Sequence, residues 1–213
     1  NTALGYQSLT SNTTAGDNTA LGYGAMAANS TGTQNTAVAS AALDANTTAN
    51  NNTAIGYNSL TANTTGSSNN AFGAESMMTN TTGNQNCAFG RQSLKTNNGS
   101  YNNGFGHQTL ELNTTGTQNQ AFGLNALFAN TTGSYNSAFG HAALTSNTTA
   151  SYNTAVGDQC LGVCTTGESN TAVGARALDA LTTANNNTSI GYSSNSGRTT
   201  GNDNTAVGAY CMN

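Results

Sequence analysis

The chain of 213 residues carries few charges: only 6% of its residues are Asp, Glu, Lys or Arg, and the formal net charge is −4. A typical globular domain has about 25% charged residues. The four cationic side chains, Arg91, Lys95, Arg176 and Arg198, are too few for a surface that holds a phosphate backbone. No apolar run approaches the ~18 residues of a membrane-spanning helix. The composition therefore predicts neither a nucleic-acid partner nor a membrane span.

One phrase of seventeen residues recurs throughout, so we treat residues 1–213 as a single repeat array. Repeat position one is the Asn that opens the phrase Asn-Thr-Ala-Leu-Gly at residues 1–5. The copies begin at residues 1, 18, 35, 52, 69, 86, 102, 119, 136, 153, 170, 187 and 204. Only the step from Asn86 to Asn102 is sixteen residues long, and the loss falls in a predicted turn, residues 97–99, which can shorten without shifting strands. Because the last copy stops early, we expect a longer array.

Position four of the repeat is apolar in every copy, and the preference of these residues for strands predicts a short strand there. Its members are Leu4, Leu21, Val38, Ile55, Phe72, Phe89, Phe105, Phe122, Phe139, Val156, Val173, Ile190 and Val207. Position five is Gly in every copy except at Ala39, which predicts a bend at the strand end. Position nine is Leu or Met except at Asn195, and it predicts a second short strand.

The period of the repeat predicts its fold class. Positions twelve to fifteen often read Asn-Thr-Thr-Gly, as at residues 63–66, which is turn chemistry. Seventeen residues are too few for a helical hairpin repeat, which needs roughly 33 or more. We therefore predict an all-β parallel β-solenoid, or β-roll, of about thirteen coils stacked about 4.8 Å apart, a rod about 60 Å long. Equal positions would form ladders along its axis, including an amide ladder of the thirteen position-one Asn residues.

We expect the large residues of positions four and nine to face the interior, with the five consecutive Phe residues serving core packing. Because side chains alternate along a strand, Ala3 would then face outward next to Leu4. Two large apolar side chains per coil contribute about 1.5–3 kcal/mol each, whereas ordering each residue costs on the order of 1.5 kcal/mol. The outward Ala column would therefore pack against other chains, most simply in a homotrimer around the long axis.

The repeat resembles known fibre repeats in its Asn-Thr-Ala-apolar-Gly phrase, its following Ser/Ala-Leu pair and its Asn-Thr-Thr-Gly turn. It looks like the shaft repeats of phage tail fibres, often found upstream of an endosialidase-type chaperone domain. It is also similar to the fourteen-residue head repeats of trimeric autotransporter adhesins, which form trimeric parallel β-rolls. The resemblance covers the whole chain and implies a structural, trimeric, extracellular or virion-borne shaft.

The residues that could carry catalysis are scattered, so we predict no enzyme and no catalytic, cofactor-binding or metal-binding residue. His107 and His141 share position six but lie two coils, about 10 Å, apart, and we interpret them as a variable exposed site. No two acids suggest the carboxylate pair, about 5–9.5 Å apart, of a glycosidase. These acids are Asp17, Asp44, Glu75, Glu111, Asp158, Glu168, Asp179 and Asp203. Hexapeptide-repeat acyltransferases are weakly similar in spacing, but their coil is longer.

The cysteines do not follow the repeat. Cys160 and Cys211 share position eight but lie three coils apart, about 14 Å, beyond the ~7 Å limit for a disulfide. Cys160 and Cys164 could face across one coil, and an interchain disulfide stays open. We favour small buried thiols in place of Ser or Ala, for Cys87 as well.

Eight copies of the turn match the glycosylation sequon, and we interpret them primarily as turns. The sequon asparagines are Asn12, Asn29, Asn46, Asn63, Asn80, Asn113, Asn130 and Asn147.

Two functional classes remain. The first is a structural fibre or adhesin shaft, extracellular, on a cell surface or on a virion, that self-associates as a trimer or filament through uncapped strand edges. The second is a ligand-binding rod for ice or glycans, with Thr columns at positions two, thirteen and fourteen, and a cell-surface glycan is then a candidate partner. Two sets of tyrosines would offer sugars an aromatic surface, Tyr6, Tyr23, Tyr57 and Tyr192 at position six and Tyr101, Tyr135 and Tyr152 at the repeat end. We favour the fibre because the Thr-Thr pairs lie in turns and are interrupted at residues 98–99.

Overall fold

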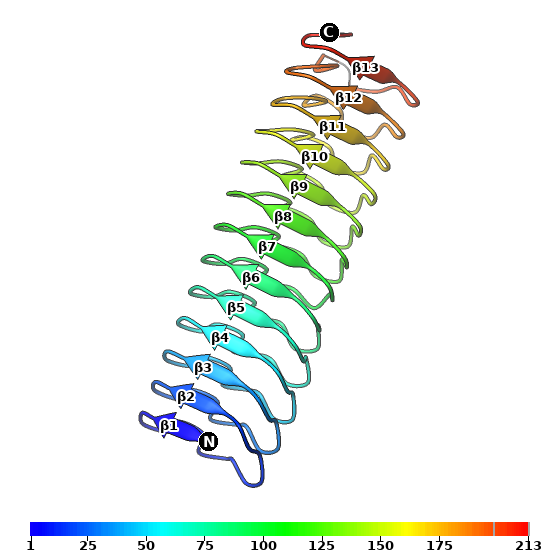
Figure 1. Cartoon of the computed structure of the whole chain (residues 1–213). Coiled ribbons are helices and arrows are strands. Elements are labelled where there is room, and N and C mark those ends of the chain that lie inside the picture. The colour runs from blue at the N-terminus through cyan, green and yellow to red at the C-terminus, as the bar shows by residue number, and fades with distance from the viewer. Residues whose placement is uncertain (198, 213) are drawn as a thin grey trace.

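The computed structural model describes residues 1–197 and 199–212, so the cation Arg198 lies outside the described residues. The chain winds into a rod with its termini at opposite ends (Figure 1). Thirteen three-residue strands form one parallel sheet in sequence order, and the described residues contain no helix. The strands are β1 (Thr2–Leu4), β2 (Thr19–Leu21), β3 (Thr36–Val38), β4 (Thr53–Ile55), β5 (Asn70–Phe72), β6 (Cys87–Phe89), β7 (Asn103–Phe105), β8 (Gln120–Phe122), β9 (Ser137–Phe139), β10 (Thr154–Val156), β11 (Thr171–Val173), β12 (Thr188–Ile190) and β13 (Thr205–Val207). The predicted all-β parallel β-solenoid is confirmed; coil n below is the repeat that contains βn.

Equal repeat positions lie directly above one another. Thr2 pairs with Thr19 and Leu4 with Leu21, and the same register continues through the sheet. The one short coil does not disturb it, because Cys87 of β6 still pairs with Asn103 of β7. The missing residue is therefore absorbed in the turn, as the sequence predicts.

The two faces of each strand are the reverse of the expectation. The position-three side chain is buried in twelve of the thirteen strands, whereas position four is exposed or half-buried, with Leu4 67% and Phe139 39% exposed. The prediction that position four faces inward, and that Ala3 and its equivalents form an outer contact surface, is wrong. Only one of two adjacent strand positions can face the interior. The Leu or Met of position nine fills the narrow coil from the opposite side and leaves room at position three only for Gly, Ala or Ser.

The stretch that carries position nine is a run of turns, so the predicted second strand is wrong. In coil 8, Asn125 and Leu127 have left-handed φ values of 57° and 51°, and the equivalent residues of the other coils do the same. This conformation is unfavourable for side chains other than Gly. Hydrogen bonds to both neighbouring coils hold it: Asn125 N–H donates to the carbonyl of His107 at 3.1 Å, and Leu127 N–H donates to that of Ala143 at 3.0 Å. With left-handed residues at positions seven and nine, the backbone places the side chain of Leu127 in the core.

The predicted amide ladder at position one links successive coils through both backbone and side chain. In coil 8 the buried Asn119 donates from Nδ2 to the carbonyl of Gly133 at 2.8 Å, across the same coil. Its Oδ1 accepts the backbone N–H of Asn136 in the next coil at 3.0 Å. In coils 1–11 the position-one Asn therefore closes its own coil in this way and holds the next coil in register.

A second amide ladder, at position twelve, was not predicted. Asn63 donates to Oδ1 of Asn46 in the preceding coil at 3.1 Å and to the carbonyl of Gly66 at 2.9 Å. The ladder is interrupted after Asn80, where the short coil follows, and after Asn147, where Cys164 replaces the next Asn. At both interruptions the buried Oδ1 of the last Asn has no hydrogen-bond partner among the described residues.

Candidate functional site

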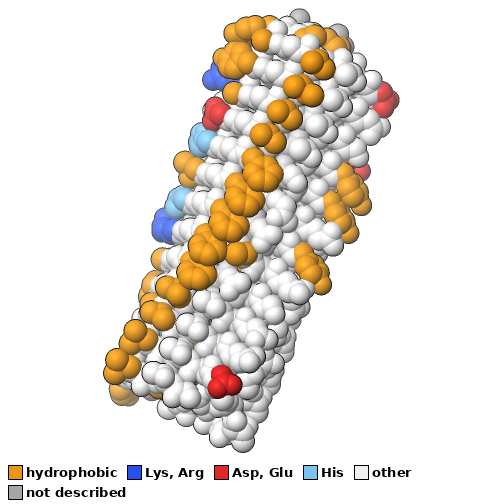
Figure 2. Space-filling model, in the orientation of Figure 1, with side chains coloured by type: hydrophobic (Ala, Val, Ile, Leu, Met, Phe, Trp, Pro, Cys, Tyr) orange, Lys and Arg blue, Asp and Glu red, His pale blue; other side chains and the backbone are white. Residues whose placement is uncertain are grey.

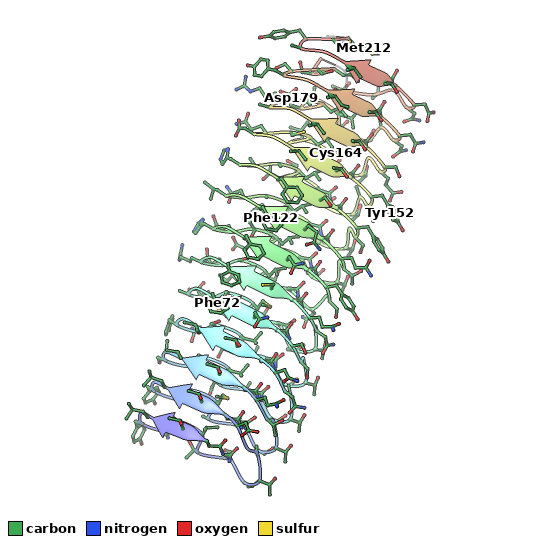
Figure 3. The ribbon with its side chains drawn as sticks, viewed as in Figure 1. Phe72, Phe122, Tyr152, Cys164, Asp179 and Met212 are labelled. Atoms are coloured by element: carbon green, nitrogen blue, oxygen red, sulfur yellow. The ribbon has the colours of Figure 1, made fainter. Side chains whose placement is uncertain are left out.

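A column of apolar side chains runs along the outer face of the sheet (Figure 2). It consists of the thirteen position-four residues, and we call it the apolar ridge. Its central part is a stack of Phe rings (Figure 3), in which Phe72 and Phe89 have centroids 4.3 Å apart and planes 7° apart. The other Phe pairs have centroids 4.7–5.0 Å apart. The ridge is continuous because the register places each member over the last.

A hollow of ≈ 490 Å³ lies on the flank of the sheet, between the columns of positions seventeen and two. We call it the Tyr-amide groove, and it is lined by Gln85, Tyr101, Asn103, Gln118, Gln120 and Tyr135. Asn103 Nδ2 donates to Oε1 of Gln120 at 2.7 Å. The ring of Tyr135 stacks on that of Tyr152, with centroids 5.0 Å apart and planes 7° apart. Tyr152 extends from the edge of the rod next to the groove (Figure 3).

The position-six histidines, the half-buried His107 and the exposed His141, belong to two separate contacts. Nη1 of Arg91 lies 3.3 Å from Nε2 of His107, and Nδ1 of His141 lies 2.8 Å from Oδ1 of Asp158. In residues 1–197 and 199–212, no three or more His, Cys, Asp or Glu side chains gather in a way that could hold a metal ion. These contacts are single pairs along one column, consistent with the predicted exposed and variable position.

The pKa values of two further acids, Glu75 and Asp179, are shifted by their surroundings. Glu75 accepts hydrogen bonds from Gln92 at 2.9 Å and from Lys95 at 3.1 Å, which lower the pKa of its carboxyl. Asp179 lines a second hollow, of ≈ 330 Å³, together with Gln159 and Gly162. Burial raises the pKa of Asp179. Its carboxylate is the only acidic side chain that lines this hollow, so the hollow offers no acid–base pair.

The prediction of small buried thiols is confirmed for two of the four cysteines, and Cys87 and Cys211 are half-buried. Sγ of Cys160 donates to the carbonyl of Ala172 at 3.3 Å, and Sγ of Cys164 to that of Gly167 at 3.4 Å. Burial raises the pKa of Cys160 to about 12 and that of Cys164 to about 11. All four cysteines are free thiols in this structure.

The sequon asparagines, predicted as turn residues, have side chains that point inward. Seven of the eight are buried, all except Asn12, and their Nδ2 groups donate within the position-twelve ladder. A folded coil therefore has no free Nδ2 for a glycan at those seven sites. The position-thirteen hydroxyls are also engaged, as at Thr131, whose Oγ1 donates to the carbonyl of Thr148 at 2.9 Å. The position-thirteen column therefore does not offer the free hydroxyl groups that an ice-binding face would need.

The sequence predicts only part of the Tyr-amide groove, namely its tyrosines. The three tyrosines at the repeat end are a visible signal, and the change at position two in neighbouring coils is a second signal that the sequence analysis does not use. That position is Thr in coils 1–4 and 10–13 and becomes Asn70, Cys87, Asn103, Gln120 and Ser137 in between. The same five coils carry Phe at position four, so the two changes together mark one segment of the rod.

No helix among the described residues is long and apolar enough to cross a membrane. Comparisons with family models, with curated proteins and with solved structures found no match to this chain. The functional argument therefore rests on the two outer surfaces of the rod, the apolar ridge and the Tyr-amide groove.

Proposed function

We propose that the chain is the structural shaft of an extracellular or virion-borne fibre or adhesin, whose copies associate side by side through the apolar ridge. The observation that carries this proposal is that position four is exposed or half-buried in every coil and buried in none. The interior is already filled by Ala at position three and Leu or Met at position nine. The ridge therefore contributes little to the core of its own coil, and burial against another molecule is the use that remains for it.

The size of the ridge supports a specific interface. Thirteen strands about 4.8 Å apart give a ridge about 58 Å long. At a width of roughly 10–15 Å it covers ~600–900 Å² per chain, close to the ~800 Å² that a stable interface buries on each partner. The largest apolar patch on a typical monomer is about 300–600 Å². The position-six pairs of Arg, His and Asp beside it would form a polar rim.

Other copies of the same rod fit this surface best. Their ridge side chains recur at the same spacing, so every coil of one copy meets a coil of another. Figure 2 shows that the ridge is a narrow band. In a dimer, one flank of a narrow ridge stays exposed to solvent. In a trimer around a common axis, each ridge contacts a neighbouring rod on both flanks. We therefore propose a parallel homotrimer built on the apolar ridge, in place of the Ala column.

The test is the mass of the assembly, measured by sedimentation velocity. The double variant F105T/F122T removes two central rings but keeps β-branched residues, which favour strands. We expect a trimer for the unaltered chain, a monomer for the variant at the same concentration, and the same far-UV circular dichroism for both. F128T is the matched control, because Phe128 is a half-buried Phe at position ten, off the ridge, and should leave the trimer intact.

The measured masses test separately the contact surface, the three-fold arrangement and self-association itself. A double variant with the mass of the unaltered chain would show that the ridge is not the contact surface. A dimer for the unaltered chain would overturn the three-fold arrangement, and a monomer at every concentration would overturn self-association altogether.

A further inference from the structure

The repeat pattern changes on neighbouring outward columns in the middle of the rod. Position two is not Thr in coils 5–9, and position seventeen is Tyr in coils 6, 8 and 9, at Tyr101, Tyr135 and Tyr152. The shortened turn at residues 97–99 lies within this region, near the end of coil 6. Thr at position two supports the same strand pairing in eight other coils. Stacking of coils therefore does not require the change, and the Tyr-amide groove is a local specialisation.

The two tyrosines that line the groove are separated along the position-seventeen column by one residue, Gln118. One face of the Tyr135 ring packs on Tyr152 in the following coil. Its other face is therefore turned back along the rod axis, toward Gln118 in coil 7. Tyr101 lies in coil 6, so the two tyrosines that line the groove are two coils, about 10 Å, apart. Gln118 interrupts what would otherwise be a continuous stack of four rings.

The floor of the groove offers amide groups. The hydrogen bond from Asn103 to Gln120 fixes both side chains. It leaves Oδ1 of Asn103 and Nε2 of Gln120 without a hydrogen-bond partner in the described part of the chain, so the pair presents one free acceptor and one free donor group. Gln85 and Gln118 add two more amides, and no charged side chain lines the groove. This set matches a ligand rich in hydroxyl groups and without charge.

We propose that the Tyr-amide groove binds a neutral glycan whose chain runs along the rod. The apolar C–H face of one sugar ring stacks on the free face of Tyr135, and its hydroxyl groups exchange hydrogen bonds with Gln118, Asn103 and Gln120. The separation of Tyr101 and Tyr135 is close to the length of a disaccharide, so neighbouring units of the glycan reach both rings. The backbone N–H groups of Gln118 and Tyr135 donate to the preceding coil at 3.1 and 3.0 Å, so these side chains extend from fixed points.

This inference is independent of the shaft proposal, since the groove lies on a single chain. Isothermal titration calorimetry would use cellotetraose, chitotetraose, maltotetraose and laminaritetraose as neutral probes and tetragalacturonate as the charged one. We expect at least one neutral probe to bind and tetragalacturonate not to bind. The double variant Y101S/Y135S should bind at least about tenfold more weakly, as expected for the loss of buried aromatic contacts. Ser is compatible with these left-handed positions, because Ser68 and Ser169 occupy them in other coils.

Two further variants make the test specific. Q118Y fills the gap and continues the Tyr stack, so it should abolish binding while the melting temperature is maintained. Y57S removes an exposed tyrosine at position six, where coil 3 naturally has Ser40, and should leave the affinity unchanged. The proposal is overturned if no neutral probe binds, if tetragalacturonate binds as tightly as the neutral probes, if Q118Y still binds, or if Y57S weakens binding as much as the groove variant.

Discussion

Replacing Asn119 by Asp changes one atom of the position-one ladder and reverses its hydrogen-bonding role. Nδ2 of Asn119 donates to the carbonyl of Gly133 at 2.8 Å and to Oδ1 of Asn102 at 3.2 Å, and the side chain is fully buried. A protonated Asp keeps one donor and leaves one of these two acceptors unpaired, which costs about 1–3 kcal/mol. An ionised Asp has no donor and faces two oxygens. The folded chain therefore holds the carboxyl protonated and raises its pKa.

The sign of the pH dependence follows from that raised pKa. The folded state of N119D binds the proton more tightly than the unfolded state, whose Asp has a pKa of about 3.9. Below about pH 3.9, the free energy of unfolding of N119D is closest to that of the unaltered chain. As the pH rises toward the folded pKa, the free energy of unfolding falls by a further ~1.4 kcal/mol per pH unit. The assay is the urea midpoint, followed by circular dichroism from pH 3 to pH 8.

The control for this variant is N51D, which adds the same charge at an exposed position where Asp17 and Asp203 naturally occur. We expect no more than a small change for N51D at any pH. If N119D loses no more stability than N51D, or becomes more stable as the pH rises, the account of the buried ladder is wrong.

Two further substitutions probe packing and strain. A Cβ on Gly104 would lie 2.5 Å from Oγ of Ser93 and 2.8 Å from Oγ1 of Thr109, so G104A should destabilise the rod by about 1–3 kcal/mol. G104A/T109S restores the Ala and Ser found together in other coils. Because Ser lacks the methyl group that restricts χ1 of Thr, its hydroxyl can rotate away from the new Cβ, and the double variant should recover part of that loss in urea unfolding; no recovery would refute this packing explanation. Ala39 has φ 116° where the other copies have Gly, so A39G should raise the free energy of unfolding by about 1 kcal/mol. A lower urea midpoint for A39G would show that Ala39 is unstrained.

The period and the register of this fold could be predicted from the sequence, because one Asn recurs at a fixed spacing and a residue lost in a turn does not move the strands. The orientation of the strands was predicted wrongly. Alternation permits either Ala3 or Leu4 inside, and hydrophobicity alone favours Leu4. The decisive signal was size. Position three varies only from Gly to Ser, whereas position four ranges from Val to Phe, which a close-packed interior does not tolerate in adjacent coils.

The second half of the coil could not be predicted from residue propensities. Leu127 and its equivalents adopt a left-handed conformation that Leu disfavours by itself, and hydrogen bonds to both neighbouring coils impose it. The buried role of the sequon asparagines was hidden for a similar reason, since Asn is also a common turn residue. The groove depends on which columns become neighbours on the outer surface, and that requires the path of the whole coil.

The most direct test of the outward-facing ridge compares an introduced thiol with the two thiols that the chain already buries. In a C87T/C211S background, F122C places a thiol on the apolar ridge, while Cys160 and Cys164 remain buried with raised pKa values of about 12 and about 11. Only thiolates react quickly with iodoacetamide. Mass spectrometry should find the F122C thiol modified rapidly in dilute solution and slowly at high concentration, where the ridge is covered, with Cys160 and Cys164 unmodified throughout. Modification of Cys160 at the rate of the F122C thiol would contradict the inside and outside assigned to the coil, and a rate independent of concentration would contradict association through the ridge.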